Sequence, residues 1–186
     1  MRDIIRMIVV LTLIGAASGL TLSVIHRVTA GPIEYQTIKF VKEPAVKKVL
    51  SGYDNDPILD REKITVGTDP RGNPIELTVF PAKKGGQTFA VAVEGTGKGF
   101  HGAIGVMVGI SKEGVILDIG ITSHSETPGI GSRVTGVEYT DRYKGLPAKK
   151  GVTVDAISGA TYSSKGVVAA VNEAVSTVAT FREEIF

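Results

Sequence analysis

The longest apolar stretch of the chain lies close to its N-terminus. No charged residue occurs over the 19 positions from Met7 to Ile25, which are mostly Leu, Ile, Val, Ala and Gly. At about 1.5 Å per residue, a helix of this length nearly matches a bilayer core of about 30 Å. The pattern therefore predicts a membrane-spanning helix, flanked by Arg2 and Arg6 on one side and by His26 and Arg27 on the other.

A cleaved signal peptide is the alternative interpretation of this stretch. The small residues of Val28-Thr29-Ala30 resemble a cleavage site. Against cleavage, the run is longer than the usual apolar region of about 7–15 residues, and His26-Arg27 stands between the run and the site. We therefore expect a retained anchor over residues 1–27, whose flanking charges are too balanced to fix its orientation.

After the anchor, the apolar residues come in short runs separated by turn residues. Runs bounded by Asp-Pro, Gly-Asn-Pro and Gly-Gly predict strands, and Lys112-Glu113-Gly114 between the two clearest runs predicts a hairpin turn. The predicted strands are 63–67, 75–80, 88–94, 103–111 and 115–122.

Helical spacing appears at both ends of this set of strands. Residues 35–50 have roughly helical spacing, with Pro44 able to serve as a first helical residue. A short helix is predicted over 130–135, and a longer one over 165–180 has valines at spacings of three or four. The order predicts an α+β fold: one N-terminal transmembrane helix followed by one antiparallel-sheet domain with flanking helices.

Composition narrows the classes of function. The 186 residues contain no cysteine, which excludes iron–sulfur clusters, thiolate zinc sites and disulfides, so any redox chemistry must use another cofactor. The formal net charge is only +2, and the lysine pairs are scattered without interleaved aromatic residues. We therefore expect no nucleic-acid partner.

Three apparent motifs fail on context. Residues 97–102 read Gly-Lys-Gly-Phe-His-Gly, but a strand pattern follows where a dinucleotide site needs a helix. His101, His124 and Glu126 lack metal-binding spacing, so no metal site is expected. Ser158, His124 and Asp155 lack the Gly-x-Ser-x-Gly turn of a hydrolase, so no catalytic residue is expected.

The most informative segment for chemistry is Asp155 to Ser164. Ser158, Gly159 and Ala160 are small and precede the hydroxyl of Thr161. We expect Ser163 or Ser164 to cap a helix that begins near Lys165, and a helix N-terminus suits a phosphate. A simple turn before a terminal helix is the alternative.

The sequence Asp-x-x-Ser-Gly-Ala-Thr over residues 155–161 resembles the flavinylation signature of the FMN-binding domain family found in RnfG and NqrC. The resemblance implies that a dedicated flavin transferase esterifies FMN onto Thr161. It further implies that Asp155, Ser158, Gly159 and Ala160 form, together with Thr161, the context that the transferase recognises. Ser158, Gly159, Ala160 and Tyr162 would also lie beside the cofactor.

A second segment supports the same family. Residues 124–131, His-Ser-Glu-Thr-Pro-Gly-Ile-Gly, resemble the family's H-x-E-T-P-G-[LI]-G segment. This resemblance implies that His124, Glu126, Thr127 and Gly129 lie near the flavin, with Glu126 capping the following short helix as the alternative. The strand at residues 107–110 and the lack of a long insertion look closer to RnfG than to NqrC.

The resemblance implies a membrane-anchored, electron-carrying subunit of an Rnf-type complex, in which ferredoxin:NAD⁺ electron flow is coupled to translocation of Na⁺ or H⁺. Its partners would be the other Rnf subunits, the flavin transferase and the inner or cytoplasmic membrane, with most of the chain on the extracytoplasmic side. Residues 28–90 would then be a linker and the first part of the soluble domain, and 91–186 the FMN-binding core. An NqrC-like subunit of a Na⁺-translocating NADH:quinone oxidoreductase and a non-redox anchored binding module remain alternatives.

Overall fold

The computed structural model describes residues 2–186, so Met1 of the expected anchor lies outside the described residues. The chain divides into an N-terminal unit that ends at Phe40 and a second unit over Val41–Phe186. Helix α1, Arg2–Thr37, makes up most of the first unit, and a π-helical turn, η1, follows it over Ile38–Lys42.

Helix α1 is long and apolar enough to cross a membrane. Two of its polar side chains are satisfied within the helix: the Thr21 hydroxyl donates to the Ala17 carbonyl at 2.9 Å, and the Thr29 hydroxyl donates to the Ile25 carbonyl at 2.8 Å. Internal satisfaction of this kind is what a lipid environment requires, because lipid offers no hydrogen-bond partners.

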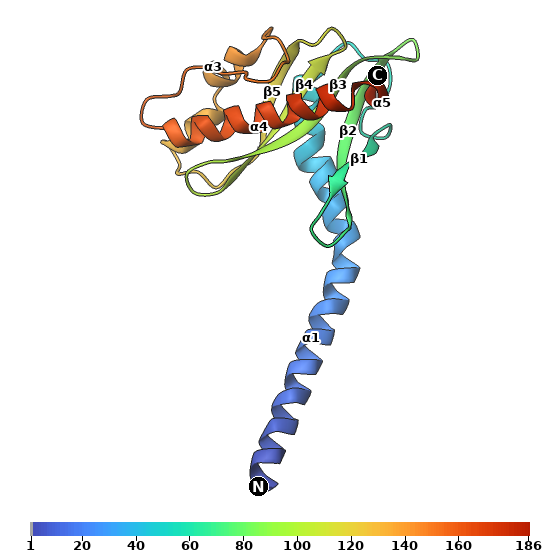
Figure 1. Ribbon diagram of the computed structural model, residues 1–186, viewed down its shortest axis with the longest axis vertical. Helices are drawn as coiled ribbons and strands as arrows, with labels where there is room; N and C mark the ends of the chain where they lie inside the picture. The colour runs from blue at the N-terminus through green and yellow to red at the C-terminus, as the bar shows by residue number, and fades with distance from the viewer. Residues whose placement is uncertain (1) are drawn as a thin grey trace. The chain divides into compact units, whose positions relative to one another are not determined.

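The second unit is built on a five-stranded antiparallel sheet in which every strand pairs with its neighbour in sequence (Figure 1). The strands are β1 Glu62–Thr68, β2 Pro74–Lys84, β3 Gln87–Lys98, β4 Ala103–Ser111 and β5 Ile116–Ser123. The fold is therefore α+β, as the sequence predicts, with the sheet flanked by helices.

Two separate cores cover the two faces of the sheet. Side chains alternate between faces along a strand, so Val91 and Val93 of β3 join one core, whereas Ala90 and Ala92 join the other. Helix α4, Thr161–Thr180, packs on the first face, and helix α2, Glu43–Val49, packs on the second. Figure 1 shows α4 lying along one face of the sheet.

Glycines let α4 approach β3 backbone to backbone. A Cβ atom added at Gly95 would lie 2.1 Å from the Ala170 carbonyl oxygen, and one at Gly97 would lie 1.9 Å from that of Gly166. No side chain fits in either place. The glycines near residue 97 therefore serve close helix–strand packing, which explains a Gly-x-Gly pattern without a nucleotide.

Short helical turns follow β5 and connect it to α4. They are η2 Gly131–Thr135, α3 Val137–Thr140 and η3 Asp141–Tyr143, and the chain ends with α5 Arg182–Ile185. Tyr139 and Tyr143 are buried here with their hydroxyl oxygens 3.2 Å apart, and Tyr139 donates to the Ser164 carbonyl at 3.1 Å. Burial and the neighbouring phenol raise the pKa of Tyr143, which keeps its phenol neutral.

The structure corrects the expected start of the last helix. Helix α4 begins at Thr161 rather than near Lys165, and its N-cap residue is Ala160, which makes no side-chain capping bond. Ser163 and Ser164 lie inside the helix and are buried, so neither caps it. Their hydroxyls bond instead to other segments of the site, as described below.

Candidate functional site

The site is built around the first turn of α4. The chain enters the helix through a tight turn, in which the Ala160 amide donates to the Ile157 carbonyl at 2.9 Å. Gly159 has φ +80°, a conformation that L side chains rarely adopt. The first amides of a helix have no partners within it, and no side chain caps this one. The turn therefore presents free N–H groups and a partial positive charge.

Only some of the hydroxyls in this segment are available. The buried Ser163 hydroxyl donates to Glu126 Oε2, and the buried Ser164 hydroxyl accepts the Ile157 amide at 3.1 Å. Thr161 and Ser158 are exposed. Of these two, Thr161 lines the neighbouring pocket and Ser158 does not.

Glu126 joins three segments of the chain from a position that is only 4% exposed. Its Oε1 accepts the amides of Phe100 and His101, each at 3.0 Å, while its Oε2 accepts the Ser163 hydroxyl. Burial alone would raise the pKa of this carboxyl, but the bonds from Ser163, His101 and Phe100 outweigh burial and hold the pKa below its ordinary value. Glu126 is therefore an ionised, buried carboxylate that connects the β3–β4 connection to α4 through hydrogen bonds.

Two glycines make room for this carboxylate. A Cβ atom at Gly99 would lie 2.6 Å from Glu126 Oε1, and one at Gly131 would lie 2.8 Å from Oε2. Any side chain at either position would therefore displace the hydrogen-bonded carboxylate. The glycine that ends the 124–131 segment is thus explained by the group it faces.

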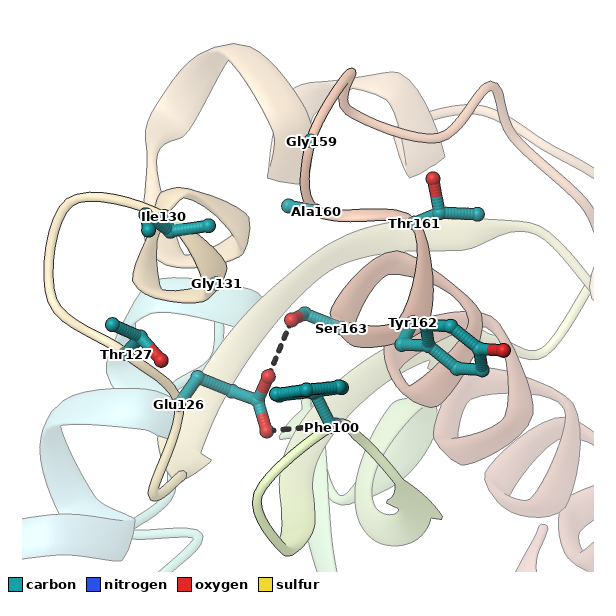
Figure 2. Close-up of a pocket in the computed structure, with 10 residues that line it drawn as sticks. All are labelled: Phe100, Glu126, Thr127, Ile130, Gly131, Gly159, Ala160, Thr161, Tyr162 and Ser163. Carbon is teal, nitrogen blue, oxygen red and sulfur yellow. Dashed lines mark hydrogen bonds between the residues drawn. The ribbon is translucent and has the colours of Figure 1, made fainter.

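A pocket of about 370 Å³ opens beside these groups. Figure 2 shows the Glu126 carboxylate directed toward Ser163 and Phe100, and the Thr161 hydroxyl directed away from that pair. The walls of the pocket come from the β3–β4 connection, the loop after β5 and the start of α4. The lining residues are Phe100, Glu126, Thr127, Ile130, Gly131, Gly159, Ala160, Thr161, Tyr162 and Ser163.

Large apolar side chains stand exposed around the pocket. Phe100 and Tyr162 are each 66% exposed, with ring centres 6.0 Å apart, and Ile130 is 54% exposed. Exposed aromatic side chains beside a concave site are typical of ligand pockets, which combine apolar walls with a few placed polar groups.

The structure brings together six of the residues expected at the site and separates the others. Those in the pocket lining are Glu126, Thr127, Gly159, Ala160, Thr161 and Tyr162. His124 and Gly129 lie outside the lining: the His124 ring accepts the Glu126 amide at 3.2 Å, and the Gly129 amide donates to Ser132 Oγ at 2.8 Å. Both therefore shape the loop.

The alternative role expected for Glu126 is wrong. No side chain caps η2, the short helix that follows, and the carboxylate is already bonded to amides of the β3–β4 connection and to Ser163. These partners are distant in sequence, so the pattern of residues 124–131 does not reveal them.

Sequence reasoning also missed four lining residues: Phe100, Ile130, Gly131 and Ser163. Phe100 could have been noticed in the sequence, because it is a large aromatic residue within the glycine-rich stretch 97–102. Ile130 and Gly131 stood inside a recognised segment without an assigned role. Ser163 is expected from the sequence to cap the helix, but α4 begins two residues before it, so Ser163 lies inside the helix.

Asp155 and Ser158 lie outside the pocket, but their main chains are held. Arg142 Nη1 donates to the Asp155 carbonyl at 2.8 Å, and Arg133 Nη1 donates to the Ser158 carbonyl at 3.2 Å. Both Asp155 and Ser158 are exposed. Their side chains are therefore accessible from solvent.

Known proteins resemble this chain over nearly its whole length. Residues 99–176 match the model of the FMN-binding domain family. The G subunit of the ion-translocating oxidoreductase complex of Methanosarcina acetivorans is 32% identical over 185 residues, which are 95% of both chains. The chain belongs to the RnfG family.

A second member of the RnfG family extends this likeness. The G subunit of the Na⁺-translocating ferredoxin:NAD⁺ oxidoreductase complex of Acetobacterium woodii is 31% identical, over 94% of this chain and 91% of that protein. Among solved structures, NqrC of Shewanella oneidensis is 24% identical and has a TM-score of 0.53, over 81% of this chain and 76% of that one. The NqrC likeness shows a common fold, and the expected RnfG-type membership is confirmed.

The pocket residues fit FMN. A flat flavin ring needs apolar or aromatic walls, which Phe100, Tyr162 and Ile130 supply. A phosphate needs donors and positive potential, which the uncapped start of α4 at Thr161 supplies. The volume of about 370 Å³ lies within the range of roughly 300–1,000 Å³ for cofactor pockets.

Proposed function

We propose that this chain is the membrane-anchored flavoprotein subunit of an Rnf-type complex, carrying FMN covalently on Thr161. Its role is to relay electrons between redox partners while ferredoxin:NAD⁺ electron flow drives ion translocation. The A. woodii relative is named as the G subunit of a Na⁺-translocating ferredoxin:NAD⁺ oxidoreductase complex, and the M. acetivorans relative as the G subunit of an ion-translocating oxidoreductase complex. Both align over nearly the whole chain. Bound flavin supplies the redox chemistry, and the protein supplies binding, orientation and local electrostatics.

One observation carries the choice of Thr161. It is an exposed hydroxyl that lines the pocket at the first position of α4, whereas Ser163 and Ser164 are buried and already bonded. Thr161 Oγ forms an ester bond to the flavin-side phosphorus of a flavin dinucleotide donor, whose pyrophosphate bond breaks. The nucleoside monophosphate leaves, the hydroxyl proton passes to a base of the transferase, and no electrons are transferred.

The remaining pocket residues hold the attached group. The free amides at the start of α4 would stabilise the negative charge of a phosphate on Thr161. Phe100 and Tyr162 would supply aromatic walls for the flavin ring, and Thr127 and Glu126 place a hydroxyl and a negative charge at the pocket wall. His124 and Gly129 keep that loop in shape through their bonds to Glu126 and Ser132.

Helix α1 serves as the anchor in this proposal. Residues 1–27 hold the chain in the cytoplasmic or inner membrane, and the rest lies on the extracytoplasmic side. Residues 28–90 form the linker and first part of the soluble domain, and 91–186 form its FMN-binding core. A covalent bond suits that compartment, because FMN lost there is hard to replace.

The test is Thr161→Val, expressed together with the flavin transferase and examined by fluorescence on a denaturing gel. The wild type should keep its fluorescence, Thr161→Val should lose it, and Thr161→Ser should keep part of it. Thr180→Val is the matched control, because it removes an exposed hydroxyl at the other end of α4. A Thr161→Val band as bright as the wild type would refute the assignment.

A further inference from the structure

The segment that leads into Thr161 is held from two sides by arginines. Residues 152–156 have no regular secondary structure. Even so, Arg142 of η3 donates to the Asp155 carbonyl at 2.8 Å, and Arg133 of η2 donates to the Ser158 carbonyl at 3.2 Å. The two bonds bracket the first half of the Asp-x-x-Ser-Gly-Ala-Thr sequence.

Both arginines bond main-chain oxygens and leave the side chains of the segment free. Within residues 2–186, neither the Asp155 carboxylate nor the Ser158 hydroxyl makes a hydrogen bond or ion pair, and both residues are exposed. Arg142 could have paired with the Asp155 carboxylate, but it takes the carbonyl instead. The recognisable groups therefore face solvent from a fixed backbone.

Further hydrogen bonds fix the backbone between Asp155 and Thr161, whose hydroxyl is the proposed attachment point. The Ile157 amide donates to Ser164 Oγ at 3.1 Å, and the Ala160 amide donates to the Ile157 carbonyl at 2.9 Å. The guanidinium of Arg142 is itself held, because it lies 5.5 Å from the centre of the buried Tyr139 ring. The segment is therefore ordered before any partner binds.

We propose that Arg133 and Arg142 are positioning residues that hold residues 155–161 in the shape that the flavin-attaching enzyme binds. The inference rests on the proposed function and adds the determinant of recognition. A segment that already has its bound conformation loses little conformational entropy when the enzyme docks. The arginines touch none of the reacting atoms, so their loss weakens docking without slowing the transfer step.

The experiment uses the full-length protein in detergent, purified from cells without the transferase. Purified transferase and a flavin dinucleotide are added, the protein concentration is varied, and initial rates are read from fluorescence after denaturation. Arg133→Met and Arg142→Met keep the apolar stem and remove the donors. Arg182→Met is the matched control, because Arg182 makes the same kind of bond to the Lys112 carbonyl, outside the segment.

Each Met variant should raise KM about three- to tenfold, the equivalent of one lost hydrogen bond, with kcat unchanged. Arg133→Lys and Arg142→Lys should recover part of the loss, because lysine keeps a charged donor. Amide hydrogen exchange over residues 153–160 should quicken in the Met variants. Arg182→Met should match the wild type in KM and kcat.

A wild-type KM in both Met variants would overturn the proposal. So would an equal rise in Arg182→Met, since that result means general destabilisation. If one Met variant lacks a folded circular dichroism spectrum, the other variant and the two Lys variants decide. Failure of the proposed function looks different: the wild type then takes no label, or Thr161→Val still takes it.

Discussion

Glu126 keeps a negative charge in a buried position because both oxygens of its carboxylate have donors. Two backbone amides face one oxygen and the Ser163 hydroxyl faces the other. The same residue lines the pocket and ties the β3–β4 connection to the start of α4. Its contribution to the site is therefore inseparable from its contribution to stability.

Truncation of Glu126 and its neutralisation should have different costs. Glu126→Ala leaves three donors without an acceptor, which should lower the free energy of unfolding by about 2–4 kcal/mol. Glu126→Gln should cost less, because its amide oxygen can face the two amides and its NH₂ group can donate to Ser163. Chemical denaturation of both variants at neutral pH measures the difference. Equal losses would contradict the bonding pattern.

The pH dependence of stability follows from the lowered pKa of Glu126. The stabilisation is fully present above the ordinary glutamate pKa of 4.5 and is lost as pH falls through the lower pKa of the folded state. The unfolding temperature of the wild type should therefore fall on acidification, and it should fall less in Glu126→Gln. Identical acid profiles for the two proteins would show that another carboxylate is responsible.

Gly159 is required by its backbone conformation, since a Cβ atom there would meet nothing within 4 Å. Replacement by Ala at φ +80° should cost about 1–2 kcal/mol, whereas Asn tolerates this conformation better. Flavin labelling and unfolding midpoint should both follow the order Gly, Asn, Ala, Val. Full labelling of Gly159→Val with a native circular dichroism spectrum would show that flavin attachment does not need this turn conformation.

At the scale of elements, the packing of α4 against β3 determines the position of the site. Gly95 and Gly97 bring the helix down onto the strand, and this contact aligns the start of α4 with the connection that follows β3. The pocket lies between the ends of those two elements. A change in helix–strand spacing should therefore alter the pocket walls.

Gly97→Ala should separate the two elements. Its new Cβ would lie 1.9 Å from a helix carbonyl, so the helix must move, at a cost of about 3 kcal/mol. Gly67→Ala in β1 is the control, because that Cβ meets nothing within 4 Å. Unfolding by denaturant measures both. Comparable stability of the two variants would show that α4 shifts without cost.

The sequence predicts most elements because their signals are local. Alternating apolar runs and turn residues give all five strands, and residues 103–111 match β4. Strand β2 runs on to Lys84, past its expected end at residue 80. Pro81 is accommodated there because β1 pairing stops at Val79, so its missing N–H faces no partner strand. Pairing partners decide such ends, and a single segment does not contain them.

The site was predictable only in part, for the same reason. The residues of 159–162 and the pair Glu126 and Thr127 could be named from two short segments. Phe100 and Ser163 take their roles from Glu126, which lies 26 and 37 positions away in the chain. Contacts across such separations come from the folded sheet and helix. They leave no pattern within either segment.

At the scale of the whole molecule, the chain separates an apolar helix from a folded unit with its own cores. Helix α1 belongs to the unit that ends at Phe40, and both cores lie within Val41–Phe186. Residues 28–186 should therefore fold without detergent. Gel filtration and circular dichroism of this fragment check the expectation. A fragment that folds only in detergent would indicate a second membrane-facing surface.

Helix α4 is the last long element of the chain, yet it covers the central strands and forms one wall of the pocket. During synthesis, β3 and β4 emerge well before the helix that buries Val91 and Val93. Until that helix is released, their apolar face has no cover, and the wall that carries Thr161 does not exist. The pocket is thus completed only after α4 has been synthesised. A cofactor that contacts both walls of the pocket can therefore bind only after α4 has been made and has packed on the sheet.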